Sequence, residues 1–120
     1  MTSVLSHIDH KGKEIIYINY SKLKGDELNN AIDSVKHYFE NSNLRDVLSL
    51  TDVTDAVADR PAMAKLQDIA NYCRTIEKKS ALVGVTGLKK VLVDGVNMLT
   101  NRDFRSFDTV AAAKEWLVHD

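Results

Sequence analysis

The chain of 120 residues contains a single cysteine, Cys73, and this scarcity excludes two kinds of protein. One cysteine cannot close an intramolecular disulfide, so a small secreted scaffold held together by disulfides is excluded. One cysteine also cannot supply the ligands of a cysteine-rich zinc site. Because Cys73 falls on the apolar stripe of an expected helix, we interpret it as a packing residue and not as a reactive thiol.

Long hydrophobic runs and an excess of charge of one sign are also missing. No apolar stretch approaches the ~20 residues needed to cross a bilayer, so we predict no stable membrane insertion. Residues 1–7 lack the basic and apolar regions of a signal peptide, and we therefore expect a cytoplasmic protein. The 16 Lys and Arg residues nearly balance the 17 Asp and Glu residues, so no positive field favours nucleic acid as a partner.

Proline and glycine are scarce, with one and five residues, and this predicts regular elements joined by short loops. The length fits one domain that covers residues 1–120. A composition with 44% hydrophobic and 28% charged residues is typical of globular proteins and excludes wholesale disorder.

Hydrophobic patterning predicts an α/β fold with about five strands and four helices in the order β-β-α-β-α-β-α-β-α. The strands are expected at 4–9, 14–20, 45–53, 81–85 and 103–107, and the helices at 26–40, 61–79, 88–99 and 110–117. Strand–helix alternation implies a mixed, mainly parallel sheet, to which the opening hairpin adds one antiparallel strand. Ser49, Thr51 and Gly84 interrupt the apolar strands, so we expect helices to cover one sheet face more heavily than the other.

Local residues predict where several of these helices begin and end. Pro61 fits the first turn of the second helix, because its missing N–H costs nothing there. Residues Glu77, Lys78 and Lys79 are expected to close that helix, with cations near its negative end. Either Asp108 or Thr109 is expected to cap the last helix.

Residues 84–90 run from an expected strand through a tight turn into a helix N-terminus, where free N–H groups and the helix dipole can bind an anion. Thr86, Gly87, Lys89 and Lys90 are therefore candidate binding residues for a small anion or a lipid head group. The segment is not a P-loop and lacks the three glycines of a dinucleotide fingerprint. The alternative is an ordinary turn with solvated lysines, and the generic character of such turns favours it.

Asp52, Asp55 and Asp59, together with Thr54, follow the carboxyl end of an expected strand, where open α/β sheets bind ligands. Asp52, Thr54 and Asp55 form a candidate regulatory loop. A phosphoacceptor aspartate of the response-regulator kind is excluded, because the acidic pair and the lysine that such a site requires are missing. A metal site would need converging ligands and has no companion motif. The favoured interpretation is a loop whose side chains cap helices and form turns.

The remaining chemistry-bearing residues form no catalytic or metal-binding pattern. The four histidines, at positions 7, 10, 37 and 119, show no metal-ligand spacing, and no G-x-S-x-G motif is present. We therefore predict that the protein is not an enzyme and uses no metal and no cofactor. The weaker alternative is an enzyme with a shallow acidic site at Asp52 and Asp55.

Three segments in the C-terminal part of the chain carry a family resemblance. Residues 81–92 (ALVGVTGLKKVL), 101–109 (NRDFRSFDT) and 113–117 (AKEWL) resemble the SpoIIAA-like (STAS-like) family of small bacterial proteins. The resemblance implies a two-layer α/β fold, with a mixed sheet and helices mostly on one side. It also implies a binding and regulatory module, since the better-known STAS domains bind partner proteins and are switched by phosphorylation of a serine at a helix start.

The expected switch region departs from the pattern of the family it resembles. Residues 52–57 contain neither glycine nor serine, and only Thr54 could accept a phosphate there. We therefore expect a non-enzymatic STAS-like module that binds a protein partner, or a second copy of itself as a homodimer, without the usual phosphoserine switch. The alternative is a binder of a small anion or lipid head group at residues 84–90, although a chain of this length has little room for a lipid-sized cavity.

Overall fold

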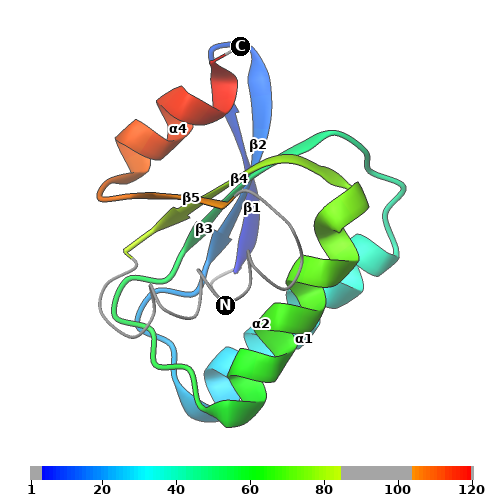
Figure 1. The fold of residues 1–120 in the computed structure, drawn as a ribbon, viewed down its shortest axis with the longest axis vertical. Helices are drawn as coiled ribbons and strands as arrows, with labels where there is room; N and C mark the ends of the chain where they lie inside the picture. The colour runs from blue at the N-terminus through cyan, green and yellow to red at the C-terminus, as the bar shows by residue number, and fades with distance from the viewer. Residues whose placement is uncertain (1–3, 85–103, 120) are drawn as a thin grey trace.

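The computed structural model describes residues 4–84 and 104–119 and contains one five-stranded sheet (Figure 1). The strands lie in chain order across the sheet: β1 (Leu5–His10), β2 (Lys13–Asn19), β3 (Val47–Asp52), β4 (Glu77–Val83) and β5 (Phe104–Phe107). The β1–β2 pair is antiparallel, and the other three pairs are parallel. The predicted mixed, mainly parallel sheet of five strands is therefore confirmed.

The helices agree with the prediction in part. The described ranges contain three α-helices, α1 (Gly25–Glu40), α2 (Arg60–Tyr72) and α4 (Val110–Val118), where four were predicted for the whole chain. The predicted helix at 88–99 lies outside the described residues. A short 3-10 helix at Cys73–Thr75 follows α2 directly and was not predicted. No helix within residues 4–84 and 104–119 is long and apolar enough to span a bilayer.

Helix α1 forms where acidic residues open an amphipathic stretch. Asp26 and Glu27 lie in its first turn, where negative charge complements the helix dipole. The residues spaced three and four apart along its apolar face are all buried: Leu28, Ala31, Ile32, Val35 and Phe39. The predicted position of this helix is confirmed.

The predicted end of the second helix is wrong. Glu77, Lys78 and Lys79 were expected to close it, but they form the first part of β4, in which Glu77 and Lys79 pair with β3. The Lys79 ammonium does lie at a helix C-terminus, but this is the end of α4. It donates to the backbone oxygen of Trp116 at 3.0 Å and to that of His119, and it lies 5.0 Å from the centre of the Trp116 ring. A cation therefore does lie at the negative end of a helix, but this cation comes from strand β4 and the helix is α4.

Helices cover both faces of the sheet, so the predicted two layers become three. Figure 1 shows α1 and α2 on one side of the sheet and α4 on the other. Ile16 and Ile18 of β2 pack with α1 and α2, whereas Ile15 of the same strand packs with α4. The described helices still lie mostly on one side, as expected. The polar residues Ser49 and Thr51 face that more heavily covered side.

Candidate functional site

The loop between β3 and α2, residues 53–59, begins with a turn closed by Asp52. One oxygen of the Asp52 carboxylate accepts hydrogen bonds from the Thr54 backbone N–H at 2.9 Å and from the Thr54 hydroxyl at 2.6 Å. The Tyr17 hydroxyl donates to the other oxygen at 3.3 Å. Burial and the neighbouring Asp52 charge raise the pKa of Tyr17 above its ordinary value, so this phenol stays a donor. The Asp52 carboxylate is thus used to shape the loop.

Backbone hydrogen bonds fasten the same loop to the segment before α1. The Lys22 N–H donates to the Thr54 carbonyl at 2.9 Å, and the Val57 N–H donates to the Leu23 carbonyl at 3.0 Å. Asp55 adopts the left-handed conformation at φ 57°, which Asp tolerates better than most residues. These contacts fix the loop, while the Val57 side chain remains 60% exposed at its outer side.

The third carboxylate of the predicted acidic cluster, Asp59, is the N-cap of α2. It accepts a hydrogen bond from the Ala62 N–H at 2.9 Å and further bonds from the Asn29 amide of α1 at 3.2 and 3.3 Å. The Ala62 bond, followed by the Asn29 bond, holds the pKa of Asp59 below its ordinary value. Asp52 and Asp59 therefore act as turn and cap residues, and no group of three metal-ligating side chains occurs in the part of the chain that the structure describes.

Thr54 packs against the backbone at the end of β4. Gly84 has φ +82°, and a Cβ added to it would lie 2.1 Å from the Thr54 Oγ1 and 2.6 Å from the Thr54 Cα. The hydroxyl that could accept phosphate is therefore both hydrogen-bonded to Asp52 and in close contact with Gly84. The other candidate residues of segment 84–90, namely Thr86, Gly87, Lys89 and Lys90, lie outside the described residues, and their binding role stays a prediction.

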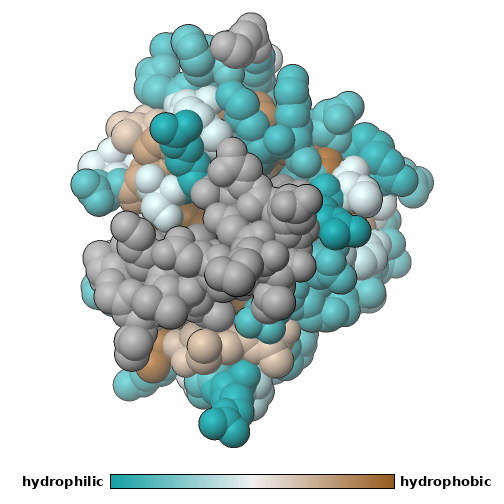
Figure 2. Space-filling view, in the orientation of Figure 1, coloured by the Kyte–Doolittle hydropathy of each residue, from teal (hydrophilic) through white to brown (hydrophobic). Residues whose placement is uncertain are grey.

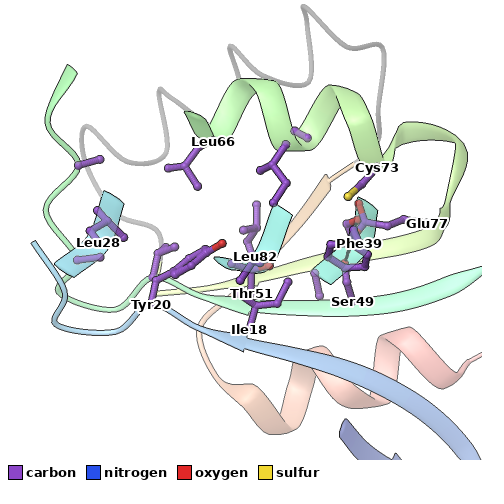
Figure 3. A pocket seen from close by; sticks show the side chains of 18 residues that line it. Ile18, Tyr20, Leu28, Phe39, Ser49, Thr51, Leu66, Cys73, Glu77 and Leu82 are labelled. Carbon is purple, nitrogen blue, oxygen red and sulfur yellow. Dashed lines mark hydrogen bonds between the residues drawn. The ribbon is translucent and has the colours of Figure 1, made fainter. Parts of the chain in front are cut away.

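A cavity of about 130 Å³ lies between the sheet and the layer formed by α1 and α2 (Figure 3). Its walls are mainly apolar side chains, with a few polar groups on the strand side. The described residues that line it are Ile18, Tyr20, Leu28, Val35, Phe39, Ser49, Thr51, Val53, Ala56, Ala58, Leu66, Ile69, Ala70, Cys73, Glu77, Ser80, Ala81 and Leu82. Sequence reasoning missed this cavity, although polar residues within apolar strands, opposite small residues such as Ala70, could have indicated it.

The polar groups of the cavity come from adjacent strands. The Ser49 hydroxyl of β3 donates to the Glu77 carboxylate of β4, and its oxygen lies 3.2 Å from the Ser80 hydroxyl oxygen. Both serines are almost completely buried. Figure 3 places Thr51 between Tyr20 and Ser49 on the floor of the cavity. Burial strongly raises the pKa of Tyr20, and Cys73 and Glu77 add to this shift, so its hydroxyl keeps its proton.

Comparison with known proteins gives a fold and no function. No protein-family model matches the chain, and no curated protein sequence matches it. Its structure is similar to the crystal structure of an uncharacterised protein of the DUF3478 family with a SpoIIAA-like fold, from Shewanella loihica PV-4. The TM-score is 0.70, the identity is 15%, and the match covers 94% of this chain and 91% of the other. The resemblance seen in the sequence is confirmed at the level of architecture, and the chain has a SpoIIAA-like fold.

Proposed function

We propose that this protein is a non-enzymatic binding and regulatory module that acts by contact with a protein partner. The loop at residues 53–59 and the first turn of α2 would form the contact surface. The observation that carries the proposal is a loop that hydrogen bonds hold in one conformation while its apolar Val57 side chain remains 60% exposed. A preformed loop loses little conformational freedom when it binds, so more of the contact energy appears as affinity.

A second exposed apolar side chain extends this surface. Met63 lies in the first turns of α2 and is 38% exposed. Figure 2 shows a band of apolar surface just above the hydrophilic lower tip of the molecule, and Figure 1 places the start of α2 near this end. Methionine side chains adapt their shape to a partner, which suits a contact surface. Val57 and Met63 thus support a contact at the carboxyl end of β3.

The surroundings of Thr54 support a mechanism without a phosphorylation switch. A phosphoryl group on Thr54 would replace the hydroxyl hydrogen that now bonds to Asp52 at 2.6 Å. It would also place about two negative charges beside the Asp52 carboxylate. The contact with Gly84 leaves the group little space. We therefore propose that partner binding is controlled by the exposed surface and not by modification of this residue.

Affinity capture with two matched variants tests the proposal. Val57→Lys places a charge on the proposed surface, and Tyr72→Lys makes the same kind of change at the far end of α2, where Tyr72 is 39% exposed. We expect the wild-type and Tyr72→Lys proteins to retain the same partner and Val57→Lys to lose it. Absence of a specific partner across growth conditions, or equal capture by all three proteins, would contradict the proposal.

We also propose self-association through a different surface, in which the partner is a second copy of the chain. We propose the sheet face that carries α4 for this contact, because it carries one helix within residues 4–84 and 104–119, whereas the other face carries two. We expect light scattering to give a particle mass of about twice the chain mass of 13.4 kDa. A strict monomer at all concentrations would rule out the homodimer but not the binding of a different protein.

A further inference from the structure

We propose that the cavity beneath α1 and α2 binds a small uncharged molecule, with a single apolar ring or chain and one hydroxyl group, whose hydroxyl is held by Thr51. This site is separate from the proposed protein-contact surface. Three observations carry the proposal: the size of the cavity, the distribution of polar groups on its walls, and the state of the Thr51 hydroxyl.

The size of the cavity sets the size of the ligand. Its volume is about 130 Å³. An engineered apolar cavity of ~150 Å³ in another protein remains dry and binds benzene, so this volume suits a molecule of about one ring. Protein interiors normally contain few voids larger than a water molecule, so a void of this size is an unusual feature in a small domain. A lipid with long chains does not fit.

The walls of the cavity set the polarity of the ligand. Apolar side chains from α1 and α2, including Leu28, Phe39 and Leu66, form the helix side. The polar side chains Ser49, Thr51, Glu77 and Ser80 gather on the strand side, and the Tyr20 hydroxyl also lines the cavity. A molecule with an apolar body and one polar end meets both sides.

The Thr51 hydroxyl provides the specific contact. It lines the cavity and makes no hydrogen bond to any other group in the described part of the chain. A hydroxyl both donates and accepts, so a ligand hydroxyl is a complementary partner. The Glu77 carboxylate, which lines the same cavity, disfavours an anionic ligand. Burial in mainly apolar surroundings also disfavours a charged group of either sign.

Calorimetric titration of the full chain with four single-ring probes tests this assignment. The probes are phenol, benzene, benzoate and benzylammonium. We expect phenol to bind more tightly than benzene by about fivefold, the value of one hydrogen bond, and the two ions to bind more weakly than either. No detectable binding of phenol would overturn the proposal. If benzene binds as tightly as phenol, or if either ion binds more tightly than phenol, the assigned ligand class is overturned.

Three variants locate the binding. Thr51→Val keeps the branched shape and should abolish the preference for phenol over benzene while leaving benzene binding unchanged. Ala70→Leu fills the cavity from α2 and should weaken both probes by at least about tenfold. Ala64→Leu makes the same change at an exposed position of the same helix and should bind like the wild type. An unchanged preference in Thr51→Val, or unchanged binding in a folded Ala70→Leu protein, would show that the probes bind elsewhere.

Discussion

At the residue scale, two glycines share one backbone conformation but differ in their surroundings. Gly12 has φ +81° and Gly84 has φ +82°, a region that disfavours residues with a Cβ. A Cβ at Gly12 would meet nothing within 4 Å, whereas a Cβ at Gly84 would meet the backbone of Thr54. The conformational strain is therefore the same at both positions, and only Gly84 adds a steric conflict.

The pair predicts two different losses of stability on substitution by alanine. We expect Gly12→Ala to lower the free energy of unfolding by about 1 kcal/mol, from backbone strain alone. Gly84→Ala should cost a further 1–3 kcal/mol, roughly, because the end of β4 must move away from Thr54. Urea unfolding of both variants measures the difference. Equal losses would show that the contact between Gly84 and Thr54 is not tight.

Residue types alone predicted some of these roles and could not predict others. The cap at Thr109 and the turn-forming use of Asp52 follow from local chemistry, which a sequence displays. The cavity does not follow, because its floor comes from β3 and β4 and its roof from α1 and α2. Thr51 becomes a candidate ligand-binding residue only when these distant segments are packed together.

At the scale of the element, the helix caps provide a test that depends on pH. Asp59 caps α2 with a carboxylate, and Thr109 caps α4 with a hydroxyl that accepts from the Ala112 N–H at 3.1 Å. The pKa of Asp59 is lower in the folded chain than in the unfolded chain. Its contribution to stability is therefore present above the unfolded pKa and is lost as the pH falls through the folded pKa.

The two alanine variants should consequently respond differently to acid. Asp59→Ala should lower the unfolding temperature at about pH 7 and differ less from the wild type at about pH 2.5, which lies below the unfolded pKa, so that part of the stabilisation by the carboxylate is lost. Thr109→Ala should lose about 1 kcal/mol at both pH values, because a hydroxyl does not titrate in this range. Thermal unfolding followed by circular dichroism checks both. A loss in Asp59→Ala that does not change with pH would contradict the role of the charged cap.

A second prediction at this scale concerns the end of α4. Lys79 reaches from β4 to the last carbonyl groups of α4, whereas its neighbour Lys78 is exposed. We expect Lys79→Met to destabilise the chain by about 1–2 kcal/mol, because it removes charge-assisted hydrogen bonds to Trp116 and His119. Lys78→Met, the control, should have almost no effect on denaturant unfolding. Similar effects of the two changes would show that the contact with α4 contributes little.

The positions of the elements were largely predictable, and the main error has a physical cause. Periodicity located α1 and the strands to within a few residues, because the buried faces impose it. The run Glu77–Lys79 was assigned to a helix end because cations favour such ends. The segment instead forms the start of β4, which pairs with β3. A single sequence does not show which segments will pair.

At the scale of the whole molecule, helices lie on both sides of one sheet, and we propose two distinct places for binding. The fold is SpoIIAA-like, and neither this architecture nor a neighbour with 15% identity specifies a partner. The outer place is the fixed loop with Val57, and the inner place is the cavity beneath α1 and α2. Helix α4 packs on the second face of the sheet and so adds a third layer. The resemblance to a two-layer fold did not indicate this layer.

We propose that the protein acts by binding a partner through the surface around Val57. The most direct measurement is the dissociation constant between the captured partner, in purified form, and the wild-type, Val57→Lys and Tyr72→Lys proteins. We expect Val57→Lys to weaken binding by at least about tenfold and Tyr72→Lys to leave it unchanged. Equal dissociation constants for Val57→Lys and the wild type, with both proteins folded, would contradict it.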